Sequence, residues 1–275
     1  MPRFYLERFA DSTGHVWTFD KSTHKVFAAN ATKLARQSGF YEAPALGSEV
    51  DQTAMESRLA DLEAQASQVT ARWLHIMGQN QAPNAKVVED NDRSIMAFYV
   101  ATQAFRTPEQ RILLSHGAAE ALKDVDLQTF HVSMLADSFI DETAKAISEF
   151  VWILARNDSG FPFYTSDHPV VLRRHDHQCL HVFQFPEPGS EVLLPLSSTV
   201  MFYAYERTHW SKLAGWDGGI SPVRFTQALV ESNNSAQVGH SRRFVFCDRD
   251  AFGFARSFCE QHPAVRDATR NRFER

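Results

Sequence analysis

Helical periodicity dominates the first half of the chain. From residue 55 to residue 76 the apolar side chains recur at alternating spacings of four and three, which predicts one amphipathic helix of about six turns. The stripe consists of Met55, Leu59, Leu62, Ala66, Val69, Trp73 and Ile76. Thr53 followed by Glu56 is a capping box that would start this helix.

Further helices are expected over residues 90–105, from Thr107–Pro108 onward, and over residues 126–156. The last of these would direct one set of apolar side chains inward: Val132, Leu135, Phe139, Ile147, Phe150 and Leu154. Residues 52–156 are therefore predicted to be almost wholly helical.

Strand patterns occupy both ends of the chain. Alternation over residues 16–21 and the run 25–30 predict an N-terminal hairpin. Later strands are expected at 161–165, 170–174, 180–185, 191–196, 199–206 and 242–248, with helices from Ser221–Pro222 to about residue 240 and over 249–262. We expect a single α+β domain over residues 1–275. Its mainly antiparallel sheet would combine the N-terminal hairpin with the strand-rich part (about 161–248) and pack against the helical block.

The composition excludes some classes of protein. With 44% hydrophobic and 22% charged residues, the chain is neither disordered nor collagen-like. A net charge of −5 argues against a broad nucleic-acid-binding surface, but it leaves a local basic cleft open. Three widely spaced cysteines suit free thiols in a reducing compartment. No apolar leader and no run of about 18 apolar residues occurs, so a cytoplasmic protein without membrane contact is expected.

A series of short motifs resembles the bacterial domain-of-unknown-function family 4238. The motifs lie at residues 2–6, 16–21, 38–41, 103–108, 165–169, 194–197 and 234–245. Their order along nearly the whole chain makes the resemblance specific, although each is weak alone. The resemblance implies a shared fold and no particular activity. The family pattern opens with two histidines that this sequence lacks. Either the start was assigned late or they are lost, and if they are catalytic in relatives this chain would be inactive.

Four polar residues in or near these motifs are the candidate catalytic residues. Asp167 ends a predicted strand and suits a general base or a metal ligand, or else an Asx turn. Gln103 and Arg106 lie three apart on one helix face and could hold an anionic group, although Arg106 could instead cap the helix. Asn234 should point inward from its helix, either as a satisfied core amide or toward a ligand.

Metal ligation is left open by the sequence. His175, His177, Cys179 and His181 alternate by two, and such a set suits zinc on a strand. The polar residues between them favour a hairpin loop instead. A divalent metal at Asp167 is the other cofactor prediction. Glu56 and Glu63, seven apart on the first long helix, are a weaker candidate for a carboxylate pair.

Three functions compete on this basis. The first is a hydrolase-like enzyme acting on a small anionic substrate, such as a phosphoester, at a pocket where Gln103, Arg106, Asp167 and Asn234 converge. The second is a non-catalytic binding or assembly protein, a homodimer formed through the helices at 53–77 and 126–156. The third is a bacterial defence or sensor module.

Overall fold

The computed structural model describes residues 1–35, 52–79, 82–107, 138–180 and 182–270. Its helices are α1 (Arg3–Leu6), α2 (Ala31–Ala35), α3 (Gln52–Gln79), α4 (Asp90–Phe105), α7 (Ser138–Glu149), α8 (Gln227–His240) and α9 (Gly253–Gln261). Its strands are β1 (His15–Asp20), β2 (Lys25–Asn30), β3 (Val151–Arg156), β4 (Thr165–Ser166), β5 (Val171–Arg174), β6 (Ser190–Pro195), β7 (Val200–Tyr205), β8 (Gly219–Ile220) and β9 (Phe244–Cys247).

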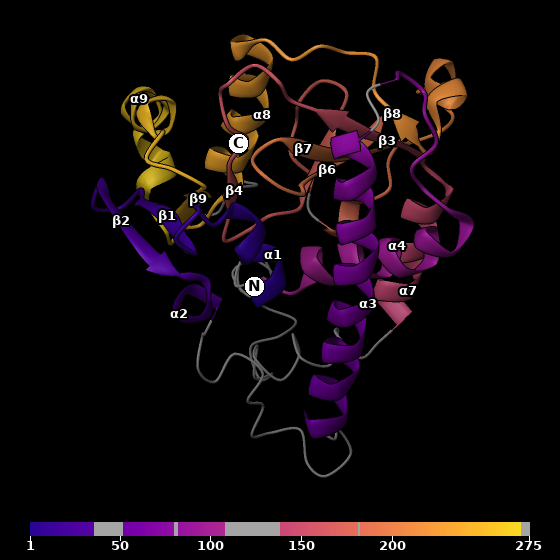
Figure 1. The fold of residues 1–275 in the computed structure, drawn as a ribbon, viewed down its shortest axis with the longest axis horizontal. Coiled ribbons are helices and arrows are strands. Elements are labelled where there is room, and N and C mark those ends of the chain that lie inside the picture. The colour runs from indigo at the N-terminus through magenta and orange to yellow at the C-terminus, as the bar shows by residue number, and fades with distance from the viewer. Residues whose placement is uncertain (36–51, 80–81, 108–137, 181, 271–275) are drawn as a thin grey trace, which may run out of the picture.

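The two ends of the described chain meet in a four-stranded sheet with the order β2-β1-β9-β4. Strand β1 pairs antiparallel with β2 on one side and with β9 on the other. On one face of this sheet, Phe19 and Val245 pack with α8 and α9. On the opposite face, Val16 and Phe246 pack with the N-terminal helix α1 (Figure 1).

The remaining strands form a five-stranded sheet with the order β5-β6-β7-β3-β8, in which β3 and β8 run parallel. Helices α3, α4 and α7 lie together against one face of this sheet (Figure 1). The contact is rich in aromatic rings. Trp73 of α3 stacks on Phe202 of β7 at a centroid distance of 6.0 Å, and Trp152 of β3 meets the same ring edge-on at 5.0 Å.

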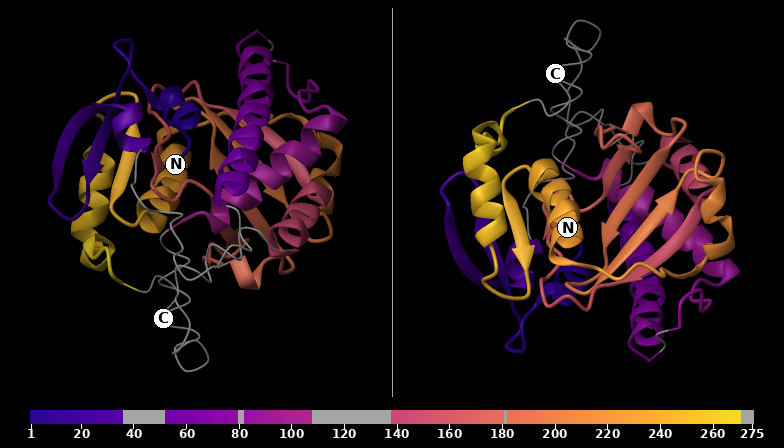
Figure 2. Two further views of the ribbon diagram at one scale, coloured as in Figure 1. Left: turned by 90° about the horizontal axis from the view of Figure 1, so that it is seen from below. Right: turned by 90° about the horizontal axis from the view of Figure 1, so that it is seen from above.

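Helix α8 lies between the two sheets. Val230 packs against the second face of the five-stranded sheet, whereas Val238 packs against the four-stranded sheet. Helix α9 lies beside α8 on that face of the four-stranded sheet, and Figure 2 shows the purple helices on the far side of the larger sheet. The five-stranded sheet is therefore buried on both faces, which favours continuous apolar strands over alternating ones.

The structure confirms the α+β class and much of the predicted order of elements. The N-terminal hairpin and the helix at 90–105 have the predicted bounds to within one residue, and α3 covers the predicted 53–77. The stripe of α3 is buried at Leu62, Ala66, Val69 and Trp73. The assignment of one domain stays a prediction, although the largest group of buried hydrophobic residues runs from Tyr5 to Phe246.

The predicted helix at 126–156 is wrong after residue 149, because residues 151–156 form strand β3, which lies between β7 and β8. Phe150 and Leu154 are buried as expected, but Phe139 is 42% exposed. A short apolar run such as 151–155 fits a buried strand as well as a buried helix, so periodicity alone could not separate the two.

Four other assignments need correction. The strands that were expected to share one sheet form two sheets, and of the strand expected at 161–165 only Thr165 belongs to a strand, the two-residue β4. Residues 180–185 were expected to form a strand, but Val182–Gln184 is a 3-10 turn. Helix α8 begins at Gln227 rather than directly after Pro222, with Thr226 as the N-cap that accepts from the main chain of Leu229. The expected helix start after Thr107, residues 126–137 and the motif at 38–41 lie outside the described residues.

Candidate functional site

The C-terminal end of α4 presents three polar side chains on one helix face. Tyr99, Gln103 and Arg106 are spaced by four and three residues, so they follow one another along the same side. Arg106 forms an ion pair with Glu63 of α3, and both side chains keep some exposure, at 15% and 23%. The Arg106–Glu63 pair therefore forms the edge of this group that solvent reaches.

Helix α1 and the residues after it cover the same face. The ring of Phe4 lies 5.8 Å from that of Tyr99. Arg8 donates a hydrogen bond to the carbonyl of Ser67 on α3 at 2.9 Å. Tyr5 donates to the carbonyl of Pro195 at 2.7 Å.

We call this group the α4 cluster. It consists of Tyr5, Arg8, Glu63, Tyr99, Gln103 and Arg106.

Burial sets the electrostatics of the α4 cluster. It raises the pKa of the Glu63 carboxyl and lowers the pKa of Arg106 to about 10. Burial also raises the pKa of Tyr99 well above its ordinary value, so that this phenol stays a neutral donor. Burial disfavours the charged form of both Glu63 and Arg106, so the charge on each side chain is stabilised by the opposite charge of the other.

Three hydrogen-bond donors in the α4 cluster have no partner within the described part of the chain. They are the Tyr99 hydroxyl, the Gln103 side-chain amide nitrogen and the Arg8 Nε. Tyr99 is 1% exposed and Gln103 is 3% exposed. Buried donors are nearly always satisfied in folded proteins, and each unsatisfied one costs roughly 1–3 kcal/mol, so three together call for a functional explanation.

Asp167 is held by main-chain contacts of its own. Its carboxylate accepts main-chain N–H bonds from Arg242, Arg243 and Phe244 at 2.7, 2.8 and 2.9 Å. The charges of Asp167, Glu63 and Arg106 all act on the amino group of Met1, whose pKa is lowered to about 6, chiefly by burial. Asp167 therefore acts on the same amino group as the Arg106–Glu63 pair, and the convergence of Asp167 with Gln103 and Arg106 stays a prediction.

Asn234 is fully engaged within the fold. Its side-chain oxygen accepts from the main chain of Tyr164 at 2.8 Å, and its amide donates to the carbonyl of Pro162 at 3.0 Å. One turn later, Gln237 donates to the carbonyl of Pro169 and accepts from Ser166, both at 2.9 Å. These contacts fix the segment 162–169 along α8.

The Asp-Lys pair that ends the first strand has a similar structural function. Lys21 is fully buried and donates to the carbonyls of Val238 and Ser241 at 2.8 and 2.6 Å, where a cation suits the C-terminal end of α8. Asp20 pairs with Arg243 at 2.8 Å.

We call this second group the α8 clasp. It consists of Asp20, Lys21, Ser166, Asp167, Asn234, Gln237 and Arg243.

The histidine-rich segment does not gather into a metal centre within the described residues, where no group of three or more metal-ligating side chains occurs. His175 stacks on His209 with centroids 4.4 Å apart, and His177 occupies a turn with φ of 63°. Cys179 contacts His240, while His181 lies outside the described residues. Metal binding by this segment stays a prediction.

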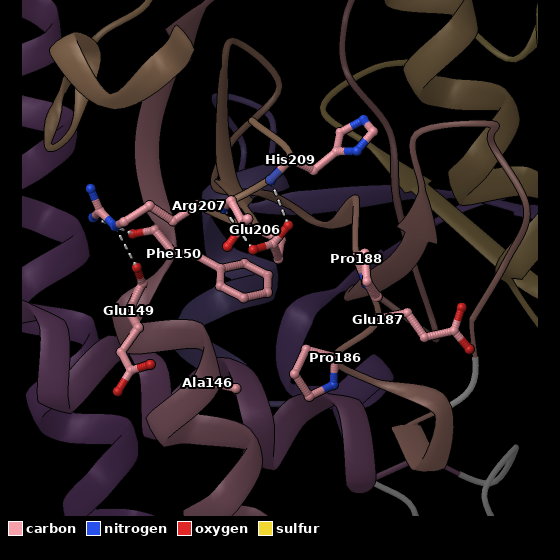
Figure 3. A pocket seen from close by; sticks show the side chains of 10 residues that line it. Ala146, Glu149, Phe150, Pro186, Glu187, Pro188, Glu206, Arg207 and His209 are labelled. Atoms are coloured by element: carbon pink, nitrogen blue, oxygen red, sulfur yellow. Dashed lines mark hydrogen bonds between the residues drawn. The ribbon is translucent and has the colours of Figure 1, made fainter. Parts of the chain in front are cut away.

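A pocket of about 920 Å³ lies elsewhere, between α7 and the turns after β7 and before β6. Figure 3 shows Phe150, Pro186 and Pro188 around it, with Glu149, Glu187 and Glu206 among its polar residues. The Glu206 carboxylate accepts main-chain bonds from Thr208 and His209, and Arg207 donates to the carbonyl of Glu149. None of the predicted site residues lines this pocket, and its carboxylates disfavour an anionic ligand.

Comparison with known proteins gives one positive result. The sequence pattern of the family described as "Protein of unknown function (DUF4238)" matches residues 1–251. The chain belongs to the DUF4238 family. No curated protein and no solved structure is significantly similar to this DUF4238 chain. Membership confirms the resemblance seen in the sequence motifs and assigns no activity.

No helix in the described part of this DUF4238 chain is long and apolar enough to cross a membrane.

Sequence reasoning missed three members of the α4 cluster, Tyr5, Arg8 and Tyr99, and considered Glu63 only as a partner of Glu56. The spacing of Tyr99 before Gln103 and Arg106 was a usable signal, because positions four and seven apart share a helix face. The contact between Glu63 and Arg106 joins two helices, so no local spacing could reveal it.

Proposed function

We propose that the chain is a hydrolase-like enzyme for a small anionic substrate, such as a phosphoester, and that the α4 cluster is its substrate site. The observation that carries the proposal is the set of buried donors without partners beside the Arg106–Glu63 ion pair. An oxyanion supplies several acceptor atoms at once, which suits a group of buried donors without partners such as those of Tyr99, Gln103 and Arg8.

The ion pair suggests how binding leads to chemistry. An anion that takes the place of Glu63 beside Arg106 forms charge-assisted hydrogen bonds with the guanidinium. Glu63 is then a partly buried carboxyl group, and burial already raises its pKa. A carboxyl with a raised pKa is suited to general acid–base catalysis near neutral pH, where it would activate water or protonate the leaving group.

Asp167 and Asn234 enter this proposal as positioning residues. Asn234 bonds to main-chain groups of residues 162–164, which come directly before β4. Asp167 follows β4 and bonds to main-chain groups of residues 242–244, at the start of the neighbouring strand β9. Thr165 of β4 shares a 2.7 Å hydrogen bond with Tyr5 of the cluster. By fixing β4, Asp167 and Asn234 would support the position of Tyr5 against α4.

The test compares thermal unfolding in about 10 mM inorganic phosphate with that in chloride of equal ionic strength. We expect phosphate to raise the Tm of the wild type by roughly 3 °C. Gln103→Met and Tyr99→Phe should abolish this rise, while Tyr205→Phe, a control in β7, should keep it. Turnover of p-nitrophenyl phosphate and its diester is then measured with the same variants. Equal Tm in both salts together with no turnover would refute the proposal.

The assembly alternative and the homodimer remain predictions. Large hydrophobic side chains that are exposed in the described part of the chain come from separate segments: Phe27, Phe139, Phe161, Val223 and Leu229. The defence or sensor alternative has no residue that argues for it. The α4 cluster is the observation that favours catalysis over both.

A further inference from the structure

Apolar side chains form much of the wall of the pocket beside α7. Phe150 is 4% exposed, and its ring centroid lies 5.4 Å from that of Phe185, so packing fixes its position. Pro186 and Pro188 line the pocket with side chains that lose no rotamer freedom on binding, and Ala146 adds a small side chain from the helix. The volume of about 920 Å³ lies in the range of small-molecule sites, which are concave and largely preformed. The pocket therefore suits the apolar body of a small molecule.

One carboxylate of this pocket is fixed in place by main-chain N–H groups. Glu206 accepts from Thr208 at 2.7 Å, from His209 at 2.9 Å and from Gly189 at 3.3 Å. Burial alone would raise the pKa of Glu206, but these bonds outweigh it and hold the pKa below its usual value. A carboxylate offers about four acceptor positions, so three bonds leave a position for one more donor.

The charge on Glu206 is not balanced by the residues around it. Neither Glu206 nor Glu149 forms an ion pair with a lysine or arginine in the described part of the chain. Arg207, which also lines the pocket, pairs with Asp217 at 2.6 Å, and Figure 3 shows its guanidinium pointing away from the Glu206 carboxylate. A third carboxylate, Glu187, lies 3.5 Å from an arginine of β5. The pocket therefore carries an excess of negative charge, which favours cations and opposes anions.

We propose that this pocket is a binding site for small organic cations that carry a primary ammonium group on an apolar body. The ammonium group donates a charge-assisted hydrogen bond to the Glu206 carboxylate. The apolar body lies against Phe150, Pro186 and Pro188, where its burial removes apolar surface from water. The site shares no residue with the α4 cluster, so it is independent of the proposed hydrolase activity.

The experiment compares three compounds that have the same phenyl ring and differ in charge. Phenethylamine is a cation at pH 7, like a lysine side chain, whereas N-acetylphenethylamine is neutral and phenylpropionate is an anion. Ligand-observed NMR titrations give the Kd of each compound for the full chain. We expect phenethylamine to bind roughly 10-fold more tightly than the neutral amide, and phenylpropionate to bind most weakly.

Substitutions locate the binding. Glu206→Gln removes the charge at nearly constant shape, so phenethylamine should lose roughly 10-fold in affinity and bind no better than the amide. Glu260→Gln is the matched control, because it neutralises an exposed carboxylate on α9. It should leave the Kd unchanged. Gln103→Met should also leave it unchanged, which separates this site from the α4 cluster.

Equal affinity of the wild type for phenethylamine and its N-acetyl derivative would overturn the proposal, as would the absence of binding at about 10 mM amine. Unchanged binding in Glu206→Gln would do the same, once circular dichroism shows that this variant is folded. If it does not fold, Ala146→Phe decides, because its ring should fill part of the pocket from α7 and weaken phenethylamine binding. An unaltered Kd in that variant would contradict the site.

Discussion

The α8 clasp and the α4 cluster are both built from polar residues, several of them buried, but they differ in how their hydrogen bonds are satisfied. In the α8 clasp, Asn234 bonds through both its oxygen and its nitrogen, and the Asp167 carboxylate accepts three N–H groups. In the α4 cluster, the Gln103 amide nitrogen and the Tyr99 hydroxyl have no partner in the described part of the chain.

This difference separates two reasons for a buried polar side chain. A satisfied group contributes stability and fixes neighbouring segments, so its loss should lower the free energy of unfolding. An unsatisfied group costs stability in the unbound protein and is retained for what it binds. Stability measurements can therefore test this difference before any substrate is identified.

The largest effect is expected from Asp167→Ala. The change removes the acceptor for the N–H groups of Arg242, Arg243 and Phe244, and we expect it to lower the free energy of unfolding by about 2–4 kcal/mol. The expected loss is not larger because the bond to Arg243 is exposed, where water can replace the lost carboxylate. Urea unfolding followed by circular dichroism gives the value. A loss below about 0.5 kcal/mol would mean that Asp167 is not structural, and would restore it as a catalytic candidate.

A matched pair of amide substitutions comes next, because Asn234 and Gln103 are equally buried, at 3% exposed. Asn234→Leu leaves the N–H of Tyr164 and the carbonyl of Pro162 unpaired, and should cost about 1–3 kcal/mol. Gln103→Met keeps the side-chain length and removes a nitrogen that has no partner, so stability should stay equal or rise by up to about 1 kcal/mol. If the two variants lose stability equally, the distinction between the two regions fails. The same urea titration serves both.

How far the sequence predicts this fold depends on how local each signal is. The stripe of α3 and the hairpin β1–β2 depend on spacing along the chain, and both were predicted closely. The strand at 151–156 was missed because burial on both faces erases the alternation that marks a strand. The motifs also led to the hypothesis that Gln103, Arg106, Asp167 and Asn234 share one pocket, and that convergence stays a prediction. Which polar groups are satisfied depends on contacts between distant segments, and the sequence alone could not show it.

The smallest effect is the response to acid, in which the two regions should differ in sign. Burial works against ionisation of Asp20, but the bonds from Arg243 and neighbouring groups outweigh it and hold its pKa below the usual value. Its contribution to stability is present above about pH 4 and is lost as the pH falls through the lowered pKa. Glu63 has a raised pKa, so its contribution is lost instead as the pH rises through that value. We therefore expect Asp20→Asn to reduce the fall in the free energy of unfolding between about pH 5 and pH 3, by less than about 1 kcal/mol, as measured by urea titration. Glu63→Gln should make that fall steeper, and an identical response from both variants would show that the two carboxylates do not differ as described.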